Sequence, residues 1–554
     1  MEKRVVIFLV LSLAVILGYD LLLKQFGLLP ATPTVQEPGG QEAAAPRGQH
    51  ETPSAETTAS APRASSSASD TASSGDSRPS LPPTERTVTV ETDFIRVAFN
   101  ARGGVISSWE LKRHYTSATD GNPVQLVYQG AKFKEPLSIT TSDVAADKAL
   151  REGLYAIETD FTTLDDAHPT GHVTLRFHDA ASGLKVQKRL TFRQENYLVD
   201  VSLTVDGLSG AYDIVLGTNF GIVEWGDGFI GLIGSASLVD GKVEKETPDL
   251  ELERKGSVQW VALQDKYFLS VLMPQGASAA LAKKEGDKLV SAGVRLPASG
   301  ARTTDLQLYA GPKEYDTLRS LNVGLEETID FGWFIFGSWS VVKAVAKPIF
   351  YVLRFINEYT HNYGVTIILL TMGIKMLFVP LQYKSYKSMK QMQLVQPKVL
   401  ALQEKYKDDR DKLNKELIKL YRDHKVNPVG GCLPMVLQMP VFVALFNILY
   451  MTIDLRQAPF VGWITDLSVQ DPYYVLPIIM GATMVIQQKI TPTTMDPTQA
   501  KIMLVLPVFM TFLFVNFPAG LVLYWLTNNV LTIGQQVLTD RLFAIRPLVT
   551  DPSK

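Results

Sequence analysis

The sequence has only one cysteine, Cys432, among its 554 residues. An internal disulfide and a cysteine-rich metal site are therefore excluded. The chain also lacks an excess of charge of either sign, because 54 basic residues face 56 acidic ones and the formal net charge is −2. The chain as a whole is therefore not a DNA binder by charge. A phosphate-binding loop is missing too, since Gly430-Gly431 lacks the lysine and serine that complete such a motif. We expect no cofactor, no metal and no catalytic residues.

The first 83 residues contain two segments that do not resemble a folded domain. Lys3 and Arg4 precede the apolar run Val5–Tyr19, and no small-x-small cleavage site follows the run directly. The pattern favours a membrane anchor over residues 1–25 with a cytoplasmic N-terminus, and a cleaved signal peptide is the alternative. Residues 26–83 are rich in Ala, Ser, Thr, Pro and Gly without hydrophobic periodicity, which predicts a disordered linker.

Residues 84–325 have the pattern of an all-β domain. Apolar and polar residues alternate along 197–205 and again along 173–177, where the turn-like 179–183 follows. This predicts a large antiparallel sandwich, and its place after the first span puts it outside the cytoplasm. The domain shows little sign of a chemical site. Its histidines are expected on exposed loops and strands and not in a metal site, and its carboxylates are expected in a surface loop and not in a sugar-acting pair. The residues considered are His168, His172, His178, Glu224, Trp225 and Asp227.

The stretch 362–382 is long and apolar enough to cross a bilayer, yet it contains one lysine, Lys375. The nearest polar flank beyond it begins at Gln382, too far for comfortable snorkelling of a lysine stem. No acidic residue lies inside another candidate span, because Asp454, Asp471 and Asp540 fall at span ends. Lys375 therefore either faces a wet cavity as a functional residue or bends toward the headgroups. Position alone does not separate these two interpretations.

Residues 331–358 are aromatic and carry Lys343, Lys347 and Arg354 on one predicted helical face. If this segment crossed the membrane, the basic segment that follows 362–382 would lie outside the cytoplasm, against the positive-inside rule. We therefore predict an amphipathic helix at the periplasmic interface.

Residues 383–428 hold twelve basic and six acidic side chains, a net charge of +6. Apolar residues recur at helical spacing around Val395 and again around Leu417, and Asp408 and Asp409 are suitable caps for the second helix. The pattern predicts a cytoplasmic helical hairpin. Such a charged surface is usually only solvated, but beside a membrane it could bind anionic lipid or ribosomal RNA.

Further apolar stretches follow the hairpin. The stretch 430–453 is long, whereas 473–487 and 502–517 are near the lower limit for a span and should thin the bilayer. The last stretch, 521–538, has a polar end with Asn528, Asn529, Thr532, Gln535 and Gln536. Together with the stretch 362–382 and the N-terminal anchor these make six transmembrane helices, five of them in a core over 362–540, and the tail 541–554 is cytoplasmic.

Several of these segments resemble the YidC family of membrane protein insertases. The resemblance covers residues from about 332 to 538 and is carried by VNPVGGCLPMVLQMPVFVALF, LRQAPF, DLSVQDPYYVLPIIMG, KITPTTMDP and FPAGLVLYWLTNNVLTIGQQ. The anchor and β domain resemble the Gram-negative branch, which implies a periplasmic β-supersandwich that is largely dispensable for insertion. It also implies a hydrophilic groove in the inner leaflet whose central cation, usually arginine, falls at Lys375 here. Lysine keeps the charge but loses the bidentate fork.

The resemblance also implies the residues that contact a substrate in the groove. Carried over by position, they are Lys375, Thr371, Gln438, Met439, Phe442, Tyr524 and Trp525. The function implied is a non-enzymatic insertase and chaperone of the bacterial inner membrane that works alone or with the Sec translocon. Nascent membrane proteins, membrane lipids and the ribosome are the expected partners.

Two other functions fit parts of the sequence. A secondary transporter also has prolines within spans and a buried charge, but the sequence has no internal repeat and no acidic coupling residue. A sugar-acting periplasmic enzyme would need only one anchor, which leaves five further crossings unexplained.

Overall fold

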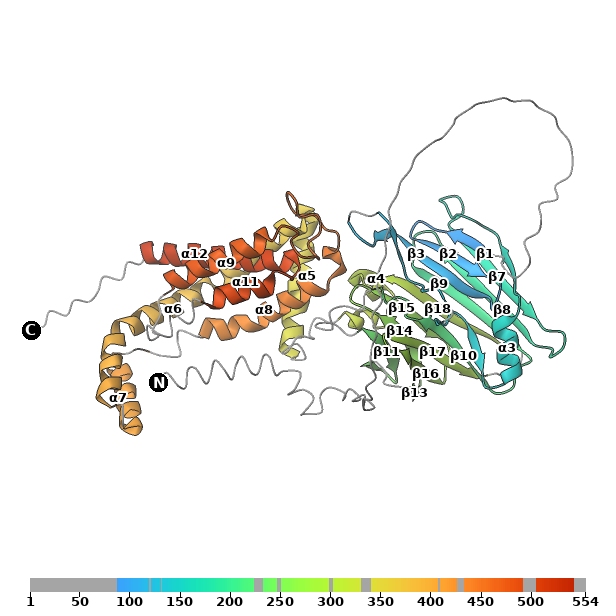
Figure 1. The fold of residues 1–554 in the computed structure, drawn as a ribbon, viewed down its shortest axis with the longest axis horizontal. Coiled ribbons are helices and arrows are strands. Elements are labelled where there is room, and N and C mark those ends of the chain that lie inside the picture. Colours follow the sequence, from blue (N-terminus) through green and yellow to red (C-terminus); the bar gives the residue numbers. More distant parts are fainter. Residues whose placement is uncertain are drawn as a thin grey trace, which may run out of the picture. The chain divides into compact units, whose positions relative to one another are not determined.

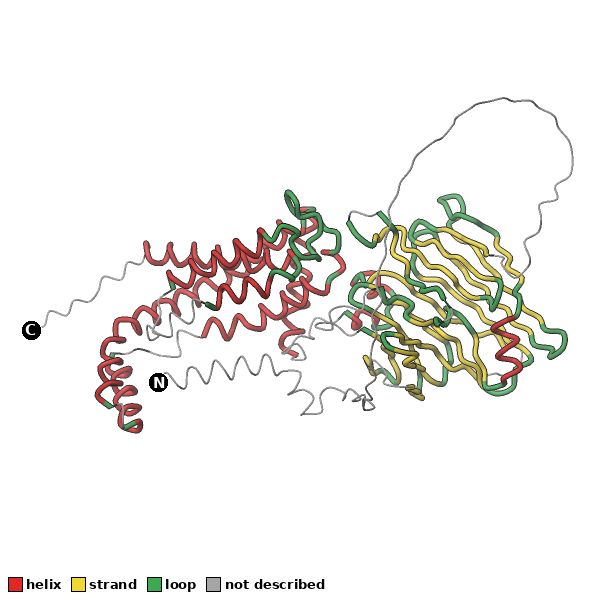
Figure 2. The backbone as a smooth tube through the Cα atoms, in the orientation of Figure 1, coloured by secondary structure: helices red, strands yellow, loops and turns green. Residues whose placement is uncertain are grey.

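The described part of the chain changes from strands to helices at about residue 330 (Figures 1 and 2). This computed structural model describes residues 87–118, 121–130, 132–223, 233–246, 251–297, 302–329, 340–406, 409–424, 426, 433–491 and 505–542. The predicted anchor 1–25 and linker 26–83 lie outside the described residues, as do Glu224, Trp225 and Asp227.

The β domain, here the described residues of 87–329, contains three sheets with antiparallel neighbours. A four-stranded sheet has the order β1 (Thr87–Glu91), β2 (Ile95–Asn100), β3 (Val105–Tyr115), β4 (Pro123–Gln125). A five-stranded sheet has the order β13 (Glu251–Lys255), β16 (Ala279–Gly286), β17 (Leu289–Pro297), β10 (Ala211–Thr218), β5 (Ile139–Thr141). A nine-stranded sheet has the order β12 (Lys242–Glu246), β11 (Gly234–Val239), β14 (Val258–Gln264), β15 (Phe268–Pro274), β18 (Arg302–Pro312), β9 (Leu198–Asp206), β8 (Lys185–Arg193), β7 (Thr170–His178), β6 (Ala156–Thr159).

The alternating sequence patterns fold as the period of a strand requires. Val173, Leu190 and Val201 are paired across β7, β8 and β9, and all three are buried. Along each strand, the residues next to them are more exposed. The predicted β-rich domain is therefore confirmed. Its core includes Trp109, whose indole nitrogen donates to the carbonyl of Ala310 at 3.1 Å. Short helices α3 (Val144–Glu152), α4 (Tyr315–Ser320) and η2 (Leu325–Thr328) complete the domain.

The C-terminal region is helical. Its elements are α5 (Ser340–Thr360), α6 (Tyr363–Lys405), α7 (Arg410–Asp423), α8 (Leu433–Met451), η3 (Ile453–Leu455), α9 (Val475–Ile490), α11 (Leu506–Phe514) and α12 (Ala519–Leu542). One face of α5 is buried in the helical core through Val342, Ala346, Phe350 and Leu353, whose spacing follows the turns of a helix. Lys343 and Lys347 on the same helix are exposed.

Helix α6 is longer than the sequence pattern suggested. A span ending near Gln382 and a separate hairpin helix were expected, but one helix of 43 residues, about 65 Å, runs through both and contains Pro380 and Pro397. Among the described residues it is the one helix that is both long and apolar enough to cross a membrane. Helix α12 is also long, with 24 residues, but it carries a row of polar side chains.

The predicted hairpin is formed by the second half of α6 and by α7, which lie side by side (Figure 1). Asp409 caps α7, because its side chain accepts from the Lys412 amide at 3.1 Å, as predicted for this position. Met392, Val395 and Val399 of α6 form a small buried cluster against which Leu417 and Leu420 of α7 pack.

Candidate functional site

The lysine inside the apolar half of α6 is buried in the helical core. Asn362 caps α6 by accepting from the Val365 amide at 3.0 Å, and this fixes the start of the helix that carries Lys375. The Lys375 side chain is 7 % exposed, and its Nζ donates to Thr532 Oγ1 of α12 at 2.8 Å. Among the ion pairs of the described residues none includes Lys375. The Lys375 ammonium is therefore hydrogen-bonded to a neutral hydroxyl oxygen and not to a carboxylate.

The threonine hydroxyl is suited to this contact. Thr532 Oγ1 lies 2.6 Å from the carbonyl of Asn528, to which it donates its hydrogen, so its lone pairs point to other groups. One of these lone pairs accepts from the Lys375 ammonium. An ammonium has three donors, so up to two N–H groups of Lys375 are available to another acceptor.

Three polar residues of α12 lie on one face of the helix. Asn529, Thr532 and Gln536 are separated by three and four residues, which places them on adjacent turns. Asn529 Nδ2 donates to Thr483 Oγ1 of α9 at 3.3 Å. Near the other end, Thr491 Oγ1 lies 3.4 Å from Gln536 Oε1, and it shares its one hydrogen between this oxygen and the Gln487 carbonyl at 2.7 Å. We call Asn529, Thr532 and Gln536, together with Lys375 of α6 that binds Thr532, the polar face of α12.

The Gln536 amide adds a second donor to the polar face. This side chain is 7 % exposed, and within the described part of the chain its Nε2 has no hydrogen-bond partner. A buried amide that lacks an acceptor costs free energy. The polar face therefore offers an ammonium and an amide donor to an incoming carboxylate or carbonyl group.

Aromatic side chains pack together beside the polar face. The Phe442 ring on α8 lies 5.1 Å from Trp525 and 6.2 Å from Tyr524, measured between ring centroids. Trp525 also contacts Phe514 of α11, at 4.8 Å between centroids. Three of the residues that the sequence pointed to, Phe442, Tyr524 and Trp525, are thus brought into one cluster.

The remaining sequence-predicted residues lie in different environments. Thr371 is one turn before Lys375 on α6 and is buried, and its hydroxyl donates to the Ile367 carbonyl at 2.6 Å. Gln438 is half-buried on α8, and the neighbouring Met439 is 43 % exposed. The hydroxyl hydrogen of Thr371 is used in the hydrogen bond to the Ile367 carbonyl, but the hydroxyl oxygen can still accept a hydrogen bond.

Sequence reasoning missed the contacts that assemble the polar face. The polar end of the last helix is evident from the sequence, but the hydrogen bond between Thr532 and Lys375 is not, nor are the partners Thr483 and Thr491. The spacing 529, 532, 536 was the available signal, since it puts all three side chains on one face of a helix.

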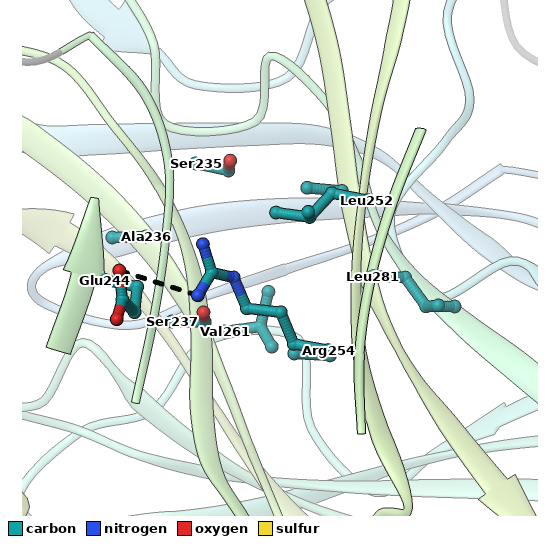
Figure 3. A pocket seen from close by; sticks show the side chains of 10 residues that line it. Ser235, Ala236, Ser237, Glu244, Leu252, Arg254, Val261 and Leu281 are labelled. Carbon is teal, nitrogen blue, oxygen red and sulfur yellow. Dashed lines mark ion pairs between the residues drawn. The ribbon is translucent and has the colours of Figure 1, made fainter. Parts of the chain in front are cut away.

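The cavities of the β domain give weaker indications of function. One cavity, of about 10 Å³, lies between Ser235, Arg254 and Leu281, and the ion pair of Arg254 and Glu244 at 3.5 Å forms part of its wall (Figure 3). This volume is suited to about one water molecule. A second, open cavity of about 600 Å³ is lined by both polar and apolar residues, among them Arg176 and Phe177 of β7 and Lys185 of β8. Arg176 is already paired with Glu158.

The chain matches two family descriptions that together cover most of its length. Residues 87–352 match "YidC periplasmic domain", and residues 355–546 match "60Kd inner membrane protein". The boundary between the two falls inside α5.

Curated relatives match nearly the whole chain. The "Membrane protein insertase YidC" of Geotalea daltonii is 38 % identical over 566 residues, covering 98 % of this chain and 99 % of the relative. The protein of the same name from Pelobacter propionicus is 39 % identical, with 98 % and 99 % covered. A solved structure, "Active YidC insertase crystal structure with the first transmembrane domain resolved", is 20 % identical with a TM-score of 0.35, covering 81 % of this chain and 92 % of that one. The last likeness is too low to add to the argument, but the sequence identity over the full length shows that this chain belongs to the YidC family of membrane protein insertases.

Proposed function

We propose that this protein inserts nascent proteins into the bacterial inner membrane and helps them to fold. The curated relatives that match the whole chain carry the name insertase, which supports this function. The reaction makes and breaks no covalent bond in the substrate, so we propose a chaperone-like role and not an enzymatic one.

The observation that carries the proposal is the buried pair of Lys375 and Thr532. A lysine in an apolar helix is costly unless it faces water or a partner, and here its partner is a neutral hydroxyl. The uncompensated charge and the polar face of α12 would form one wall of a hydrophilic groove. A hydrophobic segment of the substrate would slide along the apolar and aromatic surface around Phe442 and Trp525, while its polar flank enters beside Lys375.

We propose six transmembrane helices. The N-terminal anchor would be the first, and α6, α8, α9, α11 and α12 would form the five-helix core, with α5 at the periplasmic interface. Both termini and the hairpin would then be cytoplasmic, and the β domain periplasmic. Helix α9 has 16 residues, about 24 Å, which is shorter than a hydrocarbon core of about 30 Å. A short α9 would thin the bilayer next to the groove and lower the cost of moving a polar flank.

Partners follow from the charge and position of the hairpin. Its excess of basic residues beside the membrane suits anionic lipid headgroups and ribosomal RNA. We propose that the hairpin and the C-terminal tail contact the ribosome, and that the protein works alone or together with the Sec translocon.

The proposal is tested by photocrosslinking to a stalled nascent chain that contains one transmembrane segment. Crosslinkers at Thr371 and Tyr524 should capture the nascent chain, because Thr371 shares a face of α6 with Lys375 and Tyr524 belongs to the aromatic cluster. Leu377 is the matched control, since it lies two residues from Lys375 on the opposite side of α6 and is 75 % exposed. Equal capture from Leu377 and Thr371 would show that the substrate does not use this face.

A further inference from the structure

A second polar contact joins α6 to α12, well beyond the pair of Lys375 and Thr532. The Tyr386 hydroxyl of α6 donates to Oδ1 of Asp540, which lies in the last turn of α12. Lys390, one turn further along α6, forms an ion pair with the same oxygen at 3.4 Å, and its Nζ lies 5.6 Å from the centroid of the Tyr386 ring. Two side chains of α6 therefore hold Asp540, one through a charge-assisted hydrogen bond and one through an ion pair.

The two contacts fasten the same faces of the two helices. On α6, Tyr386 follows Lys375 by eleven residues, which is close to three full turns. On α12, Thr532, Gln536 and Asp540 follow one another at intervals of four residues and so share a face. Residue numbers rise together on both helices, so α6 and α12 run parallel, and the contacts are about 12–17 Å apart along them.

A weak point of α6 lies between the two contacts. Pro380 has no amide hydrogen, so the Met376 carbonyl lacks the partner that a helix would normally supply, and helices bend most readily at such a position. We call the part of α6 after Pro380 its hairpin half, because it packs on α7 through residues such as Val395. Bending at Pro380 would therefore move the whole hairpin relative to Lys375.

We propose that Asp540 is a positioning residue that fixes the hairpin half of α6 against α12, and that the hydrogen bond from Tyr386 is the contact that holds it. With this bond in place, α6 stays in register with α12 across Pro380, which keeps Thr532 opposite Lys375. Without it, the hairpin half swings about Pro380 and the Lys375 ammonium loses its fixed place. This inference rests on the proposed function but concerns how the site is held together.

A simple charge effect of Asp540 predicts the opposite result. Asp540 is an anion on the same face of α12 as Thr532, so its charge repels an acidic flank that moves toward Lys375. Removal of the charge alone should therefore raise the insertion of acidic substrates. Loss of the positioning contact should lower it, because Lys375 is then no longer held in place. The two explanations differ in the sign of the effect.

The test uses the full-length protein and compares three variants of this contact. Asp540→Ala removes the acceptor, and Tyr386→Phe removes only the donor hydroxyl. Asp540→Asn removes the charge but keeps an acceptor oxygen, because both contacts of Asp540 go to Oδ1. Asp423→Ala is the matched control, since it removes an exposed carboxylate of α7.

The first measurement needs no substrate. Spin labels replace Ile418 of α7 and Leu538 of α12, which are 59 % and 56 % exposed, in a Cys432→Ser background. Electron–electron resonance should give one narrow distance distribution for the parent, for Asp540→Asn and for the control. Asp540→Ala and Tyr386→Phe should give a broad distribution, because the hairpin half is no longer fastened to α12.

The second measurement compares a one-span substrate that has two acidic residues in its flank with one that has none. Asp540→Ala and Tyr386→Phe should lower the ratio of the two insertion yields roughly fivefold. The substrate without acidic residues should still be inserted, so failure of this inference can be told from failure of the insertase function. Asp540→Asn should match or exceed the parent ratio, and the control should match it.

Three results would overturn the inference: an unchanged or higher ratio in Asp540→Ala, a narrow distance distribution in that variant, or an Asp540→Asn variant that behaves like Asp540→Ala. If Asp540→Ala does not yield folded protein, the same comparison is made with Tyr386→Phe, which removes a single hydroxyl group.

Discussion

At the scale of single residues, the chemistry of the candidate site depends on a cation whose partner is neutral. A carboxylate beside Lys375 would neutralise it and compete with acidic groups of a substrate. Thr532 instead orients the ammonium through one hydrogen bond and leaves its charge in place. A lysine attracts acidic groups as a point charge and without the fixed geometry of an arginine fork. The site is therefore suited to substrates whose flanks differ in sequence.

The charge of Lys375 should matter in proportion to the acidic residues of the substrate. We expect Lys375→Arg to insert a one-span substrate like the parent, and Lys375→Ala to be weaker by on the order of 1–3 kcal/mol of lost attraction. Lys375→Glu should fail, because an anion would repel an acidic flank. The measurement compares substrates with zero, one or two acidic residues in the translocated flank.

The control for this series is Lys384→Glu, which reverses an exposed charge further along the same helix. It should leave insertion unaffected. Equal insertion of the two-acid substrate by Lys375→Glu and the parent would exclude an electrostatic role for Lys375.

His114 on β3 should make the β domain less stable in acid. Burial lowers the pKa of His114 to about 4, although Glu314 Oε1 lies 3.9 Å from its Nε2. Glu314 compensates poorly, because burial raises the pKa of its carboxyl group. The unfolded chain, with a histidine pKa near 6.5, binds the extra proton between about pH 6.5 and 4, so stability is lost as the pH falls through this window.

The loss is roughly 2–3 kcal/mol over that range, since one pKa unit corresponds to about 1.4 kcal/mol. The measurement is the thermal unfolding midpoint of the full-length protein in detergent at pH 6.5 and 4.5. His114→Gln cannot titrate, so its midpoint should fall less than that of the parent. Parallel decreases in the two proteins would contradict the assignment, because the acidic residues that they share would then explain the effect.

At the scale of elements, the sequence predicts which residues share a face of a helix better than it predicts where a helix ends. The polar residues at the end of α12 and the apolar rows of the hairpin follow helical spacing, and the structure contains both. The partners on α9 could not be predicted, because they depend on how closely helices pack. Gly481 shows the same dependence between α9 and α11: a Cβ there would lie 2.0 Å from Thr511 Oγ1, so glycine permits that close approach.

The helix break expected between the span and the hairpin is absent for a related reason. The sequence turns polar at Gln382, yet the backbone remains helical to Lys405. A change of solvent does not end a helix, and the residues beyond Gln382 keep apolar positions that pack on α7. The two interpretations of Lys375 could not be separated from the sequence either, since only the packing of α12 supplies Thr532.

Helix α5 should lie along the membrane surface and not cross it. It has 21 residues, enough to span, but it does not reach the apolar character of α6, and Lys343 and Glu358 near its two ends are exposed. In a Cys432→Ser background, cysteines at both positions should react with a membrane-impermeant thiol reagent added from the periplasmic side. Labelling of one from the periplasm and of the other only from the cytoplasm would show that α5 crosses.

At the scale of the whole molecule, the β domain and the helices each have a hydrophobic core built mainly from their own residues. The β-domain core is built around Trp109, Trp260 and Tyr309, and the helical core around Phe446, Leu467 and Tyr524. Because burial of apolar surface is the main source of stability, each core should resist unfolding largely on its own. This arrangement agrees with the expectation that insertion depends mainly on the helices.

A substitution that weakens only the β-domain core tests this separation. Lys188 is 2 % exposed, and its Nζ donates to the carbonyls of Gly104 at 2.7 Å and of Leu137 at 2.8 Å. Lys188→Met keeps the side-chain volume but leaves these carbonyls without a donor. Burial lowers the pKa of Lys188 to about 7, so relief of that desolvation offsets part of the loss. We expect a net destabilisation of the β domain of about 2–3 kcal/mol.

Lys188→Met should therefore lower the unfolding midpoint of the β domain while the protein still inserts a one-span substrate at temperatures below that midpoint. Lys185→Met changes an exposed lysine of the same strand and should alter neither property. Thr532→Val should have the opposite pattern, since it removes the acceptor of Lys375 from the helical core and leaves the β domain untouched. A loss of insertion in Lys188→Met while its helices remain folded would mean that the β domain takes part in insertion directly, and that the two cores do not act separately.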